Sequence, residues 1–158
     1  MIKWLERIQL TIGVLFLLTF FVTIVIQVIT RISGVSAIWT EEVATYSFIW
    51  SVFMGAAVML NRREHFQFDF LLKKLKGKSK NSLFLFNDLL LLAFSLAIFY
   101  FGIQAVQNFW SYTWTSLEQM KMGYVWISIP IMGATMSIYT IAHIFRNIKN
   151  FNSEEVTE

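Results

Sequence analysis

Residues 41–69 read EEVATYSFIWSVFMGAAVMLNRREHFQFD, and this stretch decides the fold of the chain. An apolar run over residues 43–60 lies between the acidic pair Glu41–Glu42 and the basic pair Arg62–Arg63. At about 1.5 Å per residue, a helix of this length crosses the hydrocarbon core of a bilayer. Ionisable groups at both ends and none inside predict a membrane helix that is held in place and does not itself carry a solute.

Three more apolar runs, at about residues 10–29, 83–106 and 125–145, are also long enough to span a membrane. The chain is 56% hydrophobic and only 15% charged, which is unusual for a soluble domain. We therefore expect an all-α integral membrane protein, with residues 1–158 forming a single four-helix membrane domain. The first run is longer than a signal-peptide core and has no cleavage pattern, so it is expected to stay uncleaved. Cysteine is absent, which excludes disulfides and thiolate chemistry.

The distribution of basic residues predicts the orientation. All but two of the 13 Lys and Arg residues lie in the N-terminus, the loop between the second and third runs, and the C-terminus. The two exceptions are Arg31 and Lys121. By the positive-inside rule both termini and the central loop are cytoplasmic. The net charge of +3 therefore requires no nucleic-acid partner.

The central loop begins with an amphipathic segment. Over residues 65–76 the apolar side chains share one face of a helical wheel, which predicts a short interfacial helix with lysines toward the lipid headgroups. His65 and Asp69 are four residues apart and would face each other on such a helix. Without a third ligand they make a poor metal site, so a hydrogen-bonded pair is the preferred interpretation.

Each apolar run carries small or weakly polar residues at helical spacing. Such residues allow close helix packing or hydrogen bonds between helices in lipid. They serve either packing within the four-helix unit or contact with a partner subunit. The candidates are Ser47, Ser51 and Gly55 in the second run, Gln104 and Asn108 in the third, and Gly133 and Ser137 in the fourth.

Few residues could support chemistry. Glu41 and Glu42 are adjacent, so on a helix their side chains point about 100° apart and cannot face one reacting group. Thr40 is the expected N-cap, and acids in a first helical turn suit the helix dipole. A contact with a periplasmic or membrane partner is the alternative for this pair. Asp88, near Lys78 and Lys80, is either a structural partner of a lysine or a functional acid. We predict no enzymatic activity, no catalytic residue and no metal site.

The motifs of the first half resemble the small membrane subunit of tripartite ATP-independent periplasmic (TRAP) transporters, the DctQ/SiaQ family. Length, four spans and cytoplasmic termini also fit this family. The residues that carry the resemblance are Arg31, Trp39-x-Glu41-Glu42, Tyr46-x-Phe48-Ile49-Trp50, Gly55-Ala56-Ala57 and His65-x-x-x-Asp69.

The resemblance implies a multi-pass protein of the bacterial inner membrane and a complex with two partners. A large membrane subunit would move an organic acid by an elevator motion, coupled to sodium, while a periplasmic binding protein captures the substrate. The small subunit would stabilise the large one, help to dock the binding protein, and carry no cofactor, with room for a bound phospholipid. Residues expected at these interfaces are Arg31, Trp39, Glu41, Glu42, Trp50, Gly55, His65 and Asp69. The resemblance leans toward sialic acid, with dicarboxylates as the other class.

Two alternatives remain open at this point. The chain could be a self-contained small transporter acting as a homo-oligomer, and Asp88 would then be its membrane-buried acid. It could also be an assembly factor or lipid-interacting protein without a transport role.

Overall fold

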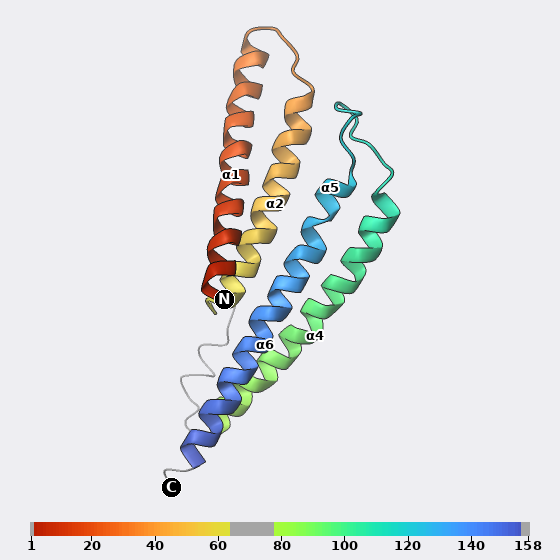
Figure 1. Ribbon diagram of the computed structural model, residues 1–158. Helices are drawn as coiled ribbons and strands as arrows, with labels where there is room; N and C mark the ends of the chain where they lie inside the picture. Colours follow the sequence, from red (N-terminus) through yellow and green to blue (C-terminus); the bar gives the residue numbers. More distant parts are fainter. Residues whose placement is uncertain (1, 64–77, 156–158) are drawn as a thin grey trace.

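The computed structural model of the chain describes residues 2–63 and 78–155 (Figure 1). Within these residues the secondary structure is helical apart from turns and one isolated bridge between Thr113 and Lys121. The helices are α1 (Ile2–Ile32), α2 (Trp39–Asn61), α4 (Lys78–Phe109), α5 (Gly123–Trp126) and α6 (Ser128–Glu155). The interfacial segment predicted at residues 65–76 lies outside the described residues, as do His65 and Asp69.

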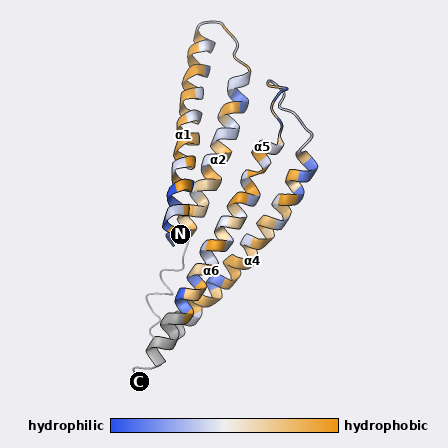
Figure 2. Ribbon diagram, in the orientation of Figure 1, coloured by the Kyte–Doolittle hydropathy of each residue, from blue (hydrophilic) through white to orange (hydrophobic). Residues whose placement is uncertain are grey.

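Four helical segments are long and apolar enough to cross a membrane: Ile2–Ile32, Trp39–Asn61, Ser82–Phe109 and Gly123–Ile148. They confirm the prediction of an all-α protein with four spans. Every segment extends beyond the apolar run from which it was predicted. Polar residues at the ends continue each helix because its backbone hydrogen bonds are closed internally, whatever the side chains are. Figure 2 shows apolar residues along the middle of the helices and hydrophilic ones toward their ends.

The helices lie in a row and do not form a closed bundle. In Figure 1, α1 pairs with α2, α4 pairs with α6, and the two pairs meet where α2 contacts α6. This order leaves α1 and α4 on the two outer sides. In the apolar part of each span, 11% of the residues are buried in α1 and α4, against 33% in α2 and 44% in the α5–α6 segment. The structural core is thus the α2–α6 contact, which we call the seam.

The turn between α1 and α2 begins with a glycine in the left-handed region. Gly34 has φ +74°, a conformation that a side chain disfavours. The amide of Gly34 donates to the Arg31 carbonyl (3.2 Å), and the amide of Val35 donates to the Thr30 carbonyl (3.0 Å). This pair of bonds is a Schellman motif, which satisfies two of the terminal carbonyls of α1.

A second interruption separates α5 from α6 at Ile127. Pro130 has no amide hydrogen, so the carbonyl of Trp126 cannot receive the helical hydrogen bond expected from that position. The hydroxyl of Ser128 donates to the Val125 carbonyl (2.6 Å) beside this break. The chain nevertheless continues in nearly the same direction, and α5 and α6 together make the fourth span (Figure 1).

Gly133 allows α4 and α6 to approach closely. A Cβ atom at this position would lie 2.6 Å from the amide nitrogen of Phe99 and 3.0 Å from the carbonyl oxygen of Ser95. These are backbone atoms and cannot move aside without shifting α4. Ser137, one turn later, is buried and donates to the Gly133 carbonyl (2.8 Å). At Gly55 in α2, by contrast, a Cβ atom would meet nothing within 4 Å.

We predict that Gly133→Ala destabilises the folded protein, because the added methyl group forces α4 and α6 apart. Overpacking of this kind costs about 2 kcal/mol, which lowers the melting temperature by roughly 5 °C. Thermal unfolding of the purified protein in detergent measures this change. Gly55→Ala is the matched control in a neighbouring helix and should not lower the melting temperature. Equal melting temperatures for the two variants would contradict the close approach at Gly133.

Candidate functional site

Glu42 joins the first turn of α2 to the loop between α4 and α5. Its carboxylate accepts hydrogen bonds from the backbone amides of Thr115 (2.7 Å) and Ser116 (2.8 Å). Hydrogen bonds to a charged acceptor are stronger than neutral ones. The loop leads directly into α5 and α6, so this contact ties together the two helix pairs at the end of the seam that is remote from the termini.

The expected cap of α2 was wrong. The helix begins at Trp39, two residues earlier than an N-cap at Thr40 predicts, and its N-cap position is Ile38, which makes no side-chain capping bond. Thr40 lies inside the first turn, and its hydroxyl donates to the Ala37 carbonyl (2.6 Å). This bond holds the turn before the helix, which is a different use of the hydroxyl from capping a free amide.

Aromatic side chains pack between the helix pairs near Glu42. The indole nitrogen of Trp50 donates to the Tyr124 carbonyl (3.0 Å), and its ring stacks on Phe16 with a centroid distance of 5.1 Å. Tyr46 meets Trp114 edge to face at 4.5 Å. Together these rings border an apolar cavity of about 260 Å³. Trp50 therefore connects α1, α2 and α5, while Ser47, buried beside it, also lines this cavity.

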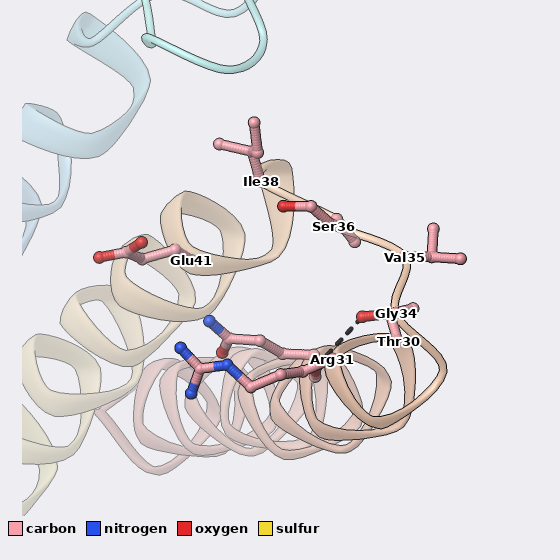
Figure 3. Close-up of a pocket in the computed structure, with 9 residues that line it drawn as sticks. Thr30, Arg31, Gly34, Val35, Ser36, Ile38 and Glu41 are labelled. Atoms are coloured by element: carbon pink, nitrogen blue, oxygen red, sulfur yellow. Dashed lines mark hydrogen bonds between the residues drawn. The ribbon is translucent and has the colours of Figure 1, made fainter.

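Arg31 and Glu41 line a different feature, an open hollow of about 340 Å³ between the end of α1 and the start of α2 (Figure 3). Glu41 and Glu42 thus point to different surroundings, as helical geometry requires of neighbours. Both Arg31 and Glu41 are exposed, and neither side chain has a hydrogen bond or ion pair with another described residue. Trp39 is 39% exposed at the start of α2.

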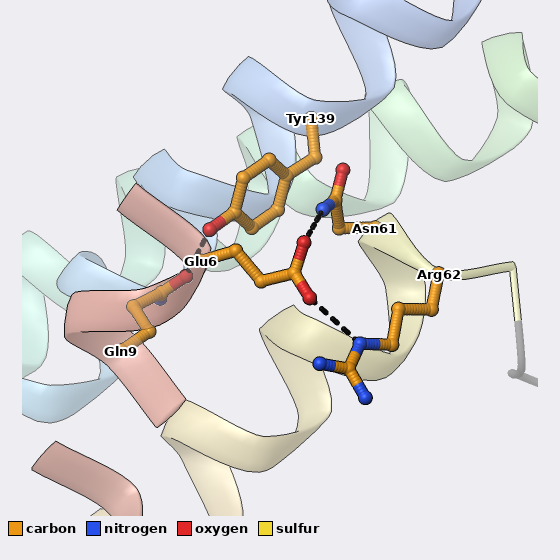
Figure 4. A network of polar contacts seen from close by, with 5 residues as sticks. All are labelled: Glu6, Gln9, Asn61, Arg62 and Tyr139. Carbon is orange, nitrogen blue, oxygen red and sulfur yellow. Dashed lines mark hydrogen bonds and ion pairs between the residues drawn. The ribbon is translucent and has the colours of Figure 1, made fainter. Parts of the chain in front are cut away.

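A polar network joins α1, α2 and α6 at the other end of the seam (Figure 4). The Glu6 carboxylate accepts hydrogen bonds from Asn61 (2.6 Å) and from Arg62 (2.7 Å). The side-chain carbonyl of Gln9 accepts from the Tyr139 hydroxyl (2.5 Å), and its amide donates to Thr135 (2.8 Å). Gln9 is 3% exposed and Tyr139 is fully buried, so these bonds are shielded from water.

Asp88 is bonded across the seam. Its side chain is 4% exposed and accepts from the guanidinium group of Arg63 (3.0 Å) and from the amide of Asn147 (2.6 Å). The guanidinium group also lies over the Phe84 ring, 4.9 Å from its centroid. Asp88 therefore connects the end of α2 with α4 and α6, through an arginine that sequence reasoning had not considered as its partner.

The remaining candidates are scattered. Ser51 is half-buried, and its carbonyl lies 3.6 Å from the position of a Cβ at Gly13, where α1 approaches α2. Gln104 and Asn108 are exposed on α4. The structure thus brings together Arg31 with Glu41, and Trp50 with Ser47, but not the predicted set as one site. Among the described residues no group of three or more His, Cys, Asp or Glu side chains could hold a metal ion.

Sequence reasoning missed the residues of the polar network. Glu6 and Gln9 are polar groups at the start of an apolar run, three residues apart, and this spacing was a usable signal for a shared helix face. Their partners Asn61, Thr135 and Tyr139 are distant in sequence, and no local pattern identifies them.

We predict that Glu42→Gln loosens the loop, because a carboxamide offers one acceptor oxygen where the carboxylate offers two. Losing one charged hydrogen bond should lower the hydrogen-exchange protection of the Thr115 and Ser116 amides about tenfold. Glu41→Gln makes the same chemical change one residue away and should leave both amides protected as in the wild type. If the two variants exchange alike, the loop is not held by Glu42.

Comparison with known proteins agrees with the architecture. The family model for tripartite ATP-independent periplasmic transporters, DctQ component, matches residues 4–150. The sialic acid TRAP transporter small permease protein SiaQ of Vibrio cholerae serotype O1 (strain ATCC 39315 / El Tor Inaba N16961) is 28% identical over 115 residues. That alignment covers 72% of this chain and 65% of the relative's length. Since the family match extends over most of its length, the chain belongs to the DctQ component family of tripartite ATP-independent periplasmic transporters.

Proposed function

We propose that the chain is the small membrane subunit of a sodium-driven TRAP transporter for organic acids, and that it acts as a scaffold for the large subunit. The four apolar helices and the family make it a multi-pass protein of the inner membrane. Sialic acid is the substrate class that we favour, because the curated relative is described as part of a sialic acid transporter.

The observation that supports the scaffold role is the way Asp88, a charged residue inside a span, is bonded to other helices. Asp88 lies six residues inside the span Ser82–Phe109, and its carboxylate is bonded to Arg63 and Asn147. An ionisable group inside a span usually marks an ion or substrate path, and for that role it must be free to bind and release a ligand. A carboxylate engaged by an arginine and an amide from two other segments is instead suited to holding helices together.

The uncovered outer helices support a large membrane partner. Both α1 and α4 expose many large apolar side chains, among them Leu18, Val22 and Val25 on α1, and Leu90, Phe94 and Phe101 on α4. A row of helices presents two such sides to its surroundings, whereas a closed bundle presents less apolar surface per helix. We propose that one of these sides packs against the large subunit and the other meets lipid.

The positive-inside rule places both termini in the cytoplasm, and hence Arg31, Glu41 and the Glu42 loop at the periplasmic face. The Glu42–loop contact would fix the shape of that face. We propose that this face contributes to docking of the periplasmic binding protein.

The test is purification of the tagged chain from its native membranes, followed by reconstitution into liposomes with a sodium gradient. We expect a much larger membrane protein to co-purify, identified by mass spectrometry. Uptake of radiolabelled sialic acid should require both membrane proteins and a solute-binding protein. Uptake by this chain alone would overturn the scaffold role, and uptake of a dicarboxylate in place of sialic acid would overturn only the substrate assignment.

We predict that Asp88→Asn lowers stability and leaves transport by the assembled complex intact. Removing the charge of one partner of a buried ion pair costs about 3 kcal/mol, or roughly 9 °C in melting temperature. Arg63→Gln should cost a similar amount, and the double variant should cost less than the sum, as expected of a coupled pair. A homo-oligomeric transporter built from this chain predicts instead that Asp88→Asn abolishes uptake.

A further inference from the structure

We propose that the hollow between α1 and α2 binds the headgroup of a phospholipid that carries both a phosphate and a primary ammonium group. The hollow measures about 340 Å³ and is lined by Gln27, Thr30, Arg31, Ser36, Ile38 and Glu41, among others. Lipid binding at this hollow requires only that the chain spans a membrane. It can therefore be tested independently of the scaffold role.

Arg31 provides the site for the phosphate. It is the last basic residue of α1, and the Schellman turn at Gly34 fixes the backbone on which it stands. Its guanidinium group has no acceptor among the described residues, although it carries five N–H donors. In Figure 3 the Arg31 side chain extends toward the side of the hairpin on which Glu41 lies. Planar guanidinium groups bind phosphate oxygens with two parallel hydrogen bonds.

Glu41 provides the site for the ammonium group. Its carboxylate lines the same hollow from the first turn of α2 and forms no ion pair with Arg31. Arg31 and Glu41 carry opposite charges and do not pair with each other. They therefore suit a ligand that has both a negative and a positive group. Figure 3 shows the two side chains on the same side of the hairpin, which allows one headgroup to reach both.

The size and surroundings of the hollow fit a lipid. A hollow of about 340 Å³ has room for a headgroup of about eight non-hydrogen atoms. Exposed apolar side chains of the loop adjoin the hollow: Val35 is 61% exposed and Ile38 69%, and both belong to its lining. Side chains of this kind on a loop between two spans favour contact with the bilayer over contact with water.

The arrangement discriminates between lipid classes. A phosphatidylglycerol headgroup has a phosphate but no cation, so it would satisfy Arg31 while leaving Glu41 beside a negative charge. A phosphatidylethanolamine headgroup satisfies both side chains and can donate hydrogen bonds to the carboxylate. The structure therefore predicts a preference for phosphatidylethanolamine.

The experiment is native mass spectrometry of the purified full chain, exchanged into an equimolar mixture of palmitoyl-oleoyl phosphatidylethanolamine and phosphatidylglycerol. We expect the wild type to retain phosphatidylethanolamine preferentially, and Glu41→Gln to lower the ratio of the two retained lipids about threefold, in the range of an exposed ion pair. Arg31→Gln should reduce retention of both lipids. Glu41→Lys should reverse the preference toward phosphatidylglycerol, because both groups are then cationic.

Glu118→Gln is the matched control, since Glu118 is also exposed at this end of the protein but does not line the hollow. It should retain lipids as the wild type does. Wild-type ratios in both Glu41 variants, with unchanged melting temperatures, would overturn the proposal. So would binding of soluble phosphoethanolamine without any lipid preference, which indicates a free ligand. Wild-type lipid retention combined with loss of a co-purifying protein in Arg31→Gln would likewise overturn it in favour of a protein interface.

Discussion

The structure depends on the contact between α2 and α6, because it is the most extensive contact between the two helix pairs in the described residues. In a membrane, burial of apolar surface gives little preference for one helix neighbour over another. Polar bonds at the two ends of the seam supply that preference. Glu42 and Trp50 bond the outer loop and α5 at one end, and the Gln9–Tyr139 and Arg63–Asp88 contacts bond α6 and α4 at the other.

This placement of polar groups explains why the chain has a fixed shape without a closed core. The bonds of Glu42, Glu6 and Arg63 lie near helix ends, where an unsatisfied polar group would otherwise meet the edge of the hydrocarbon region. The Gln9–Tyr139 bond is buried within the seam. A buried cluster that includes Ala57, Met132 and Tyr139 packs in the seam, and Gly133 brings α4 against α6. These polar residues thus serve internal contacts. Arg31 and Glu41, which bond no other side chain in the described part of the chain, lie at a periphery suited to lipid or protein neighbours.

Hydrophobic run length was sufficient to predict four spans, and helical geometry correctly separated the surroundings of Glu41 from those of Glu42. Local patterns failed where the deciding partner is distant in sequence. Nothing near Asp88 indicates that Arg63 will reach it, and nothing near Glu6 indicates Asn61. Thr40 was misassigned as an N-cap because its hydroxyl is equally able to bond a preceding carbonyl. The order of the helices in the row could not be predicted from the sequence either. Gly55 and Gly133 look alike in sequence, but of these two glycines only Gly133 faces the backbone of a neighbouring helix.

The central claim, that this subunit is a static scaffold, is tested most directly by the distance between its two helix pairs during transport. The chain has no cysteine, so a pair of engineered cysteines at Val22 on α1 and Phe101 on α4, both exposed, can carry spin labels without background. Double electron–electron resonance on the reconstituted complex, with and without substrate and sodium, then reports that distance. A scaffold predicts one narrow distribution that substrate and sodium leave unchanged. A shift of several ångströms on adding substrate and sodium would contradict the account, because it would make the seam a moving part of the transporter.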